Sequence, residues 1–182
     1  TAAGRLGQRF AMSVWMAMAE THMAARYGRD LVDHFTYAIA GDGCLMEGVS
    51  HEAASMAGHM GLGRLIVLFD DNGISIDGST DLAVSDDTTA RFAAYGWQVL
   101  AVEGHDIKAV SAGITEARAE EDKPTLIRCR TVIGYGAPTK AGTSGAHGAP
   151  LGGGERAGSR AEIGWGQKPF VMTQPIIDSW CS

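Results

Sequence analysis

Apolar residues in this chain fall into two kinds of segment, which alternate over its first 130 residues. Segments of the first kind are short, almost continuously apolar runs that stop at glycine or polar residues, which is typical of buried β-strands. Segments of the second kind are longer, lack proline and carry apolar residues at helical spacing. The pattern predicts strands at 35–40, 64–69, 97–102 and 125–129. It predicts helices at 8–27, 47–60, 86–95 and 107–117.

Alternation of strands and helices predicts the fold class. Successive β-α-β units with right-handed crossovers build a parallel sheet, and helices then cover both of its faces. Such strands are buried on both sides, which explains why they are apolar throughout rather than alternating. We therefore expect an α/β fold with a doubly wound parallel sheet flanked by helices. In this architecture ligands bind beyond the carboxyl ends of the strands.

The composition of the sequence changes after Thr131. Residues 133–154 contain eight glycines and two prolines, so this segment is not expected to form a regular element. Long irregular segments inside a compact domain are usually functional or disordered. A short helix is expected at 155–163, followed by a proline-containing tail to Ser182.

Composition and charge exclude several classes of protein. The length of 182 residues suits one domain, and 45% hydrophobic residues can supply a core. A net charge of −6 without a basic patch argues against nucleic-acid binding. No apolar run is long enough to span a membrane. The three cysteines show no CxxC spacing, so a reducing, cytoplasmic location is expected.

Two polar residues follow neighbouring predicted strands. Asp42, within Gly41-Asp42-Gly43, follows the first strand, and Asn72 follows the second. One β-α-β unit would bring both side chains to the same edge of the sheet. Carboxylate and amide oxygens suit Mg²⁺, which completes its shell with phosphate oxygens and water. Gly41 and Gly43 would let a phosphate approach the backbone closely.

Each motif also has an ordinary interpretation as a solvent-exposed turn. Gly-Asp-Gly and Asp-Asn-Gly are common turn sequences, and neither indicates a ligand site when it occurs alone. What favours the metal site is their joint occurrence, because each ends an apolar strand at the spacing of a single β-α-β unit.

These residues resemble the thiamine diphosphate fingerprint, and the surrounding sequence is similar to the transketolase family. The similarity covers GDGCLMEGVSHEAASMAGHMGLGRLIVLFDDNGISIDG (41–78), RFAAYGWQVLAVEGHD (91–106) and KPTLIRCRTVIGYGAPTKAGTSGAHGAPLG (123–152). It also includes Gly4-Arg5-Leu6-Gly7-Gln8, which is similar to the family's GPLGQG. The resemblance implies a thiamine diphosphate-binding fold, with thiamine diphosphate and Mg²⁺ (or Ca²⁺) as cofactors.

The resemblance also implies roles for particular residues. Asp42 and Asn72 would bind the metal through their side chains, and Ile74 through its backbone carbonyl. Gly41 and Gly43 would line the diphosphate, and Gly4, Leu6 and Ile76 would pack around the thiamine rings. His147 would contact the diphosphate and help to position the donor sugar, as a catalytic residue. Glu47 would lie near a dimer interface, in a network that joins two sites.

Three residues depart from the family pattern. Arg5 replaces a proline, while Arg9 and Trp15 replace glycines. The two arginines add bulk near the expected ring pocket and its supporting turn. Trp15 places an indole where glycine allows close packing, which puts the ring pocket and the dimer contact in doubt. Four methionines of the first helix, Met12, Met16, Met18 and Met23, are expected to fill the core.

The family's members have three domains, and the chain matches the later part of the first. We expect residues 1–167 to form an N-terminally incomplete diphosphate- and Mg²⁺-binding domain. Residues 168–182 resemble the linker to the next domain. The pyrimidine-binding domain, with the glutamate that helps to activate the cofactor, has no counterpart in the sequence. Activity on sugar phosphates is therefore expected only when another chain supplies that domain. The chain is also expected to form a homodimer or to bind a partner chain.

Two hypotheses about function follow. The first is a transketolase-like module for two-carbon ketol transfer between sugar phosphates, inactive without a pyrimidine-binding domain. The second is a short protein that keeps the fold but has a diverged role, either a hydrolase or a non-catalytic binder of cofactor or phosphate. No GxSxG or HExxH motif is present, which weakens the hydrolase hypothesis.

Overall fold

The computed structural model of the chain describes residues 6–181. The chain divides into two compact units, Thr1–Thr131 and Val132–Ser182. The division falls where the sequence changes from alternating apolar segments to a glycine-rich segment.

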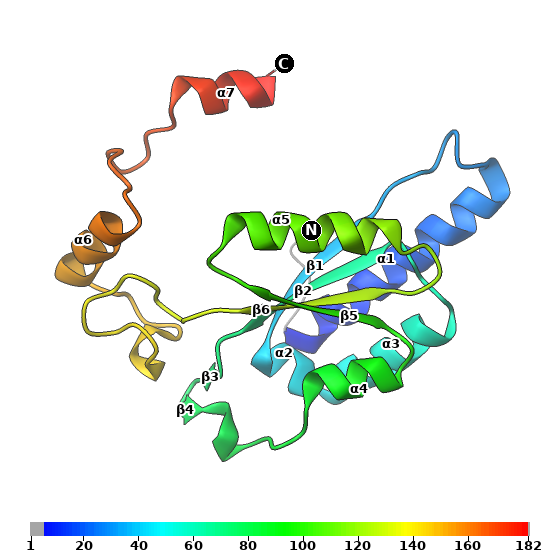
Figure 1. Cartoon of the computed structure of the whole chain (residues 1–182), viewed down its shortest axis with the longest axis horizontal. Coiled ribbons are helices and arrows are strands. Elements are labelled where there is room, and N and C mark those ends of the chain that lie inside the picture. The colour runs from blue at the N-terminus through cyan, green and yellow to red at the C-terminus, as the bar shows by residue number, and fades with distance from the viewer. Residues whose placement is uncertain (1–5, 182) are drawn as a thin grey trace. The chain divides into compact units, whose positions relative to one another are not determined.

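The first unit is built on a parallel sheet of four strands in the order β1-β2-β6-β5 (Figure 1). All three strand pairs are parallel. The strands are β1 (Thr36–Gly41), β2 (Leu65–Asp71), β5 (Gln98–Glu103) and β6 (Thr125–Arg130). The four predicted strands are thus all present, and each agrees with its predicted range to within two residues.

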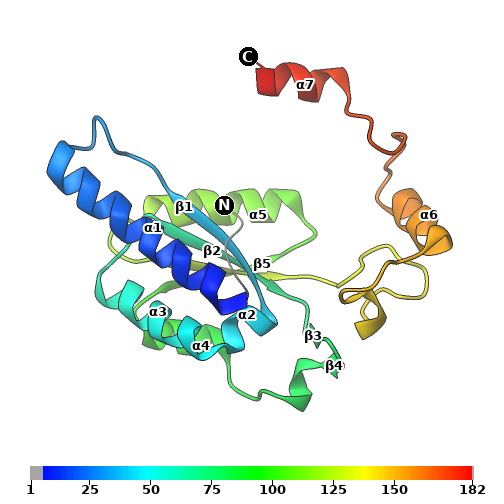
Figure 2. The ribbon, with the colours of Figure 1, turned by 180° about the vertical axis from the view of Figure 1, so that it is seen from behind.

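Helices cover both faces of this sheet, which confirms the predicted fold class (Figures 1 and 2). Alternate residues of β2 enter two separate cores, because side chains of a strand point to opposite faces. Val67 and Phe69 join the core on one face, and Ile66 joins the core on the other. The first face carries α1 (Leu6–Tyr27), α3 (Gly48–His59) and α4 (Thr88–Ala94), and the second carries α5 (Ile107–Ala119).

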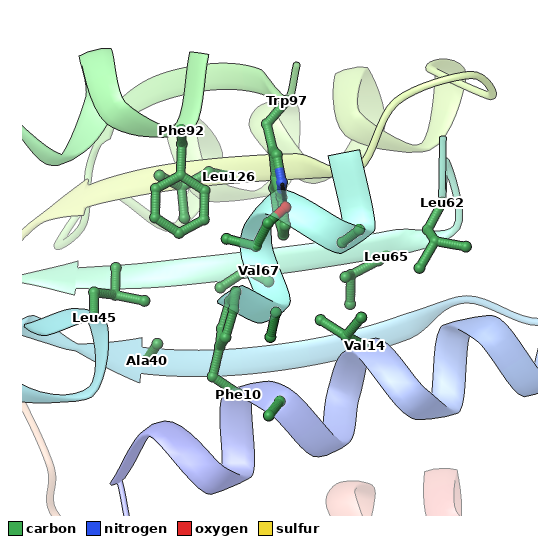
Figure 3. Packing of buried hydrophobic residues seen from close by; sticks show 14 of the residues in the cluster. Phe10, Val14, Ala40, Leu45, Leu62, Leu65, Val67, Phe92, Trp97 and Leu126 are labelled. Carbon is green, nitrogen blue, oxygen red and sulfur yellow. Dashed lines mark hydrogen bonds between the residues drawn. The ribbon is translucent and has the colours of Figure 1, made fainter. Parts of the chain in front are cut away.

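Three aromatic rings link the helices of the first face to the sheet (Figure 3). The Phe92 and Trp97 ring centroids lie 4.9 Å apart in an edge-to-face arrangement. Phe10 of α1 lies 6.1 Å from each of them. The indole N–H of Trp97 donates to the carbonyl oxygen of Ala54 in α3 at 2.8 Å, so the buried polar atom is satisfied. The cluster therefore fastens α1, α3 and α4 to the same region of the sheet.

Aspartate side chains set where two of the helices begin. The carboxylate of Asp87 accepts hydrogen bonds from the N–H groups of Thr89 and Ala90, at 2.8 and 3.1 Å. Asp106 caps α5 in the same way. An N-cap residue lies outside the helix that it caps. For this reason α4 starts at Thr88, two residues later than the sequence pattern predicts.

Several short elements were not predicted. Asp42–Met46 forms a one-turn helix, α2, directly after β1. A two-stranded antiparallel hairpin follows β2, made of β3 (Ile74–Ser75) and β4 (Gly78–Ser79). It leads into a 3₁₀ turn, η1 (Thr80–Leu82). Elements of this length leave almost no periodic signal in a sequence.

The second unit contains few regular elements. These are η2 (Ser144–Ala146), α6 (Gly153–Glu162) and α7 (Gln174–Cys181), of which only α6 was predicted. The glycine-rich segment before α6 is irregular, as predicted. Within residues 6–181, every helix is too short or too polar to cross a bilayer.

Candidate functional site

The ends of β1 and β2 bring Asp42 and the 71–73 turn together. The strands pair in parallel, with Gly41 opposite Asp70, so the residues that follow them emerge at one edge of the sheet. The backbone N–H of Gly73 donates to Oδ2 of Asp42 at 3.2 Å. The spacing of a single β-α-β unit thus places the acid and the amide-bearing turn in direct contact.

Hydrogen bonds hold the Asn72 side chain in one orientation. Its Oδ1 accepts from the N–H of Ile74 at 3.0 Å, and its Nδ2 donates to Asp70 at 3.2 Å. Asp70 in turn accepts from the hydroxyl of Thr131. Because an amide oxygen has two lone pairs, Oδ1 of Asn72 keeps one acceptor position beyond the bond to Ile74.

Open space surrounds the glycines that flank Asp42. A Cβ atom placed on Gly41 or Gly43 would meet no protein atom within 4 Å. The backbone of Gly41 has a φ of −91°, which any residue can adopt. Neither close packing nor backbone conformation therefore requires glycine at these positions, and the open space is consistent with a ligand lying against the backbone.

The surroundings of Asp42 disfavour its charged form. Burial raises the pKa of this carboxyl, and the nearby Asp71 carboxylate raises it further. Backbone N–H groups of Gly73, Asn72 and Asp42 itself oppose the rise in pKa without cancelling it. A cation beside Asp42 would favour the carboxylate, because opposite charge stabilises the ionised form.

Arginines from β6 neutralise the Asp71 carboxylate, and this pairing was not predicted from the sequence. The Asp71 carboxylate lies 2.6 Å from Nε of Arg128 and 3.2 Å from Nη1 of Arg130. Asp71 is 7% exposed, so its charge needs these partners. A sequence signal did exist, because a charged residue ends the apolar run of β2 and two arginines end that of β6.

A cavity of about 590 Å³ opens at this edge of the sheet. Its volume lies within the range of small-molecule sites. The 71–73 turn, Ile74 of the hairpin and most of the segment from Ser79 to Thr89 line it. Its lining includes Asp42, Asp71, Asn72, Gly73, Ile74, Ser79, Asp81, Asp86, Thr89, Arg128 and Arg130.

The residues present fit a hard cation bound together with an anionic ligand. Asp42 and Asn72 offer a carboxylate and an amide oxygen, and backbone carbonyls of the same turn are adjacent. Over residues 6–181, no group of three or more His, Cys, Asp or Glu side chains is arranged to hold a metal ion by itself. Magnesium requires no such group, because it keeps several waters and phosphate oxygens as ligands. The donor set does not suit structural zinc.

Other residues predicted for the site either do not line this cavity or lie outside the described residues. Leu6 begins α1 and is 50% exposed, and Ile76 in the hairpin turn is 72% exposed. His147 belongs to the second unit and is exposed there. Gly4 and Arg5 lie outside the described residues.

The outer face of α1 differs from the prediction. Met12, Met16 and Met23 are each more than 40% exposed, so only Met18 packs against the core. Trp15 is 59% exposed. The indole therefore does not overpack the interior of the first unit. The expectation that these methionines fill the core is wrong, because a second apolar stripe runs along the solvent side of the helix.

Glu47 lies close to the start of α1, at the N-terminus of α3. It is exposed and occupies the position between α2 and α3. A Cβ on Gly7 would fall 2.6 Å from the Cβ of Glu47, so glycine is needed there for the close approach of the two segments.

Comparisons with known proteins agree with this architecture. The family model described as transketolase, thiamine diphosphate binding domain, matches residues 1–182. A plasmid-encoded transketolase of Cupriavidus necator is 56% identical over 99% of this chain and 28% of its own length. Transketolase 1 of Escherichia coli is 50% identical over 99% of this chain and 28% of its own length.

Solved structures show the same relationship. A transketolase from Leishmania mexicana superposes with a TM-score of 0.91 at 41% identity, over 98% of this chain and 28% of that one. A transketolase mutant from Pichia stipitis gives a TM-score of 0.90 at 43% identity, over 98% of this chain and 27% of that one. The chain thus spans just over a quarter of the length of these relatives. It belongs to the transketolase family, and it corresponds to that family's thiamine diphosphate-binding domain.

Proposed function

We propose that the edge of the sheet at Asp42 and Asn72 binds Mg²⁺ (or Ca²⁺) together with the diphosphate of thiamine diphosphate. The side-chain oxygens of these two residues and the carbonyl of Ile74 would hold the metal. Gly41 and Gly43 would leave room for the diphosphate. The hydrogen bond from Gly73 to Asp42 carries the proposal, because it joins the two strand ends that supply the metal ligands.

Residues outside the metal edge would complete the cofactor site. Gly4, Leu6 and Ile76 would pack around the thiamine rings, which is compatible with the exposed side chains of Leu6 and Ile76. His147 would contact the diphosphate and orient the donor sugar. When bound, thiamine diphosphate supplies the carbon–carbon bond chemistry, and the protein positions it.

We infer that the chain serves two-carbon ketol transfer between sugar phosphates when a pyrimidine-binding domain is also present. One solved relative, a Pichia stipitis transketolase 43% identical to this chain, is a complex with sedoheptulose-7-phosphate. By itself the chain should bind the cofactor without turnover, because the glutamate that helps to activate it would come from the other domain. The boundary between residues 1–167 and 168–182, and a cytoplasmic location, stay predictions.

Calorimetry tests this function directly. Thiamine diphosphate titrated into the chain should bind with Mg²⁺ present and bind far more weakly in EDTA, because the metal would bridge Asp42, Asn72 and the diphosphate. The same protein, with cofactor saturating, should transfer no ketol group from a ketose phosphate to an aldose phosphate. Binding independent of metal would contradict the metal site, and robust turnover would contradict the need for a second domain.

We also propose that the chain self-associates through α1. Met12, Met16 and Met23 follow one another at helical spacing on its outer face, and Trp15 lies beside them. Contiguous exposed apolar side chains of this kind mark association surfaces. Glu47 is adjacent to the start of the helix, so a twofold dimer using α1 would include the segment around Glu47.

Replacing Trp15 tests this surface. If the indole is buried between two copies, Trp15→Gly should weaken dimerisation by about 30-fold, since a buried tryptophan can supply about 2 kcal/mol of association energy. Light scattering at micromolar concentration measures the effect. Trp165→Ala, which removes an exposed tryptophan from the second unit, should leave the dimer intact. A strict monomer in all three proteins would rule out the interface.

A further inference from the structure

Both oxygens of the Glu155 carboxylate hold the glycine-rich segment of the second unit. Oε1 accepts from the hydroxyl of Thr139 at 2.6 Å, and Oε2 accepts from the N–H groups of Thr139 and Lys140 at 3.0 and 3.2 Å. The hydroxyl of Thr139 is the main cause of the lowered pKa of Glu155, so the group is held as the carboxylate. Glu155 lies in the first turn of α6, and its side chain therefore ties this helix to residues 139–140.

Hydrogen bonds that do not involve Glu155 also hold the glycine-rich segment together. Nζ of Lys140 donates to the carbonyl oxygen of Pro150 at 3.1 Å, which joins the two ends of residues 140–150. The N–H of Gly142 donates to the carbonyl oxygen of Ile133, which precedes this loop, at 2.8 Å, and within the loop the N–H of His147 donates to the carbonyl oxygen of Ser144 at 2.9 Å. His147 thus lies in a closed loop whose first residue is bound to Glu155. Residues 140–150 form the His147 loop.

Helix α6 also packs closely against the chain that leads into the His147 loop. A Cβ on Gly158 would fall 2.3 Å from Cγ of Pro138, so the helix approaches this proline as closely as glycine permits. Gly136 has a φ of 79° and lies against Ser159 and Glu162. Few other buried contacts support the segment, since Ala137 is its one buried apolar residue among those described. A segment with so few contacts orders only if polar groups fix it.

We propose that Glu155 is a positioning residue, which holds the His147 loop in one conformation and thereby presents His147 to the bound diphosphate. The inference rests on the proposed function of His147. Glu155 itself would touch neither cofactor nor substrate. Its effect on binding would come from ordering the loop before the ligand arrives, which lowers the entropy lost on binding.

Hydrogen exchange on the ligand-free chain tests the positioning step by itself. In Glu155→Ala, the amides of Gly142, Ala146 and His147 should exchange about tenfold faster or more, because the loop opens more often. None of these amides bonds to Glu155, so their protection reports the loop and not the lost acceptor. Glu162→Ala is the matched control, because it removes a glutamate from the same helix and keeps the Cβ that contacts Gly136. In Glu162→Ala, the amides of the His147 loop should exchange at the same rates as in the unaltered chain.

Calorimetry with thiamine diphosphate and Mg²⁺ tests the link to function. Glu155→Ala should weaken binding by about tenfold, and combining it with His147→Ala should add little to the loss from His147→Ala alone. Unchanged exchange in Glu155→Ala would overturn the positioning role. Faster exchange with unchanged affinity, while His147→Ala binds weakly, would overturn the link between order and binding. If His147→Ala also binds normally, the proposed role of His147 fails, even where exchange shows that Glu155 orders the loop.

Discussion

Asp42→Ala should abolish measurable Mg²⁺-dependent binding of thiamine diphosphate. Asp42 is the one charged protein ligand in the proposed metal site, so its loss leaves an amide and a carbonyl oxygen. Residues that merely support metal ligands cost about 10–100-fold in affinity when removed, and a ligand itself should cost at least the upper end of that range. Isothermal titration with and without Mg²⁺ measures the change. Affinity close to that of the unaltered chain would remove Asp42 from the site.

Two further variants separate loss of the ligand site from loss of the fold. Burial and the neighbouring Asp71 carboxylate raise the pKa of Asp42, so the charged side chain costs stability in the ligand-free protein. Asp42→Asn should therefore melt at the same or a higher temperature, although it no longer binds Mg²⁺ tightly. Asp81→Ala removes an exposed carboxylate from the wall of the same cavity, and its affinity should change by only about twofold. A melting temperature of Asp42→Asn below that of the unaltered chain would indicate that Asp42 stabilises the fold.

The contact between Asp42 and the 71–73 turn shows what could be predicted from the sequence. The two apolar runs before these residues agree closely with β1 and β2, although only β2 is buried along most of its length and the edge strand β1 exposes Tyr37 and Ile39. Sequential strands joined by a helix usually lie side by side, and β1 and β2 do. The meeting of Asp42 with Gly73 follows from these two properties alone.

The pairing of Asp71 with the arginines shows what could not be predicted from the sequence. It depends on β6 lying between β2 and β5, although β5 precedes β6 in the chain. Apolar patterns locate strands but carry little information on which strand is inserted where. Arg128 is recognisable in the sequence as a charged residue within a predicted strand. Its partner, however, depends on the order of the strands in the sheet.

The prediction that the methionines of α1 fill the core was wrong for a different reason. A helix with apolar residues on nearly every side can be buried in a core or can pack against a partner, and the sequence does not separate the two. In the structure Phe10, Val14 and Ala17 face the sheet, which leaves Met12 and Met16 on the outside. Those positions would have been assigned correctly only with knowledge of the neighbouring surfaces.

Phe10→Ala should lower the free energy of unfolding by about 3–5 kcal/mol, the usual cost of removing a buried phenylalanine. Phe10 is 2% exposed and lies against both Phe92 and Trp97, so the change leaves a cavity where α1, α4 and the sheet meet. Domains are stable by only about 5–15 kcal/mol, so the change would remove a large share of the stability. Urea denaturation followed by circular dichroism measures the loss.

Tyr27→Ala is the matched control, because it removes an aromatic ring from the same helix at a position that is 50% exposed. Its free energy of unfolding should change by less than about 1 kcal/mol, as for other partly exposed positions. If Phe10→Ala does not fold, Phe10→Leu retains most of the volume and should lose about 1–1.5 kcal/mol. Equal losses in Phe10→Leu and Tyr27→Ala, both small, would mean that α1 tolerates a cavity at the aromatic cluster. The helix would then be held chiefly by its contacts with α3 and β1.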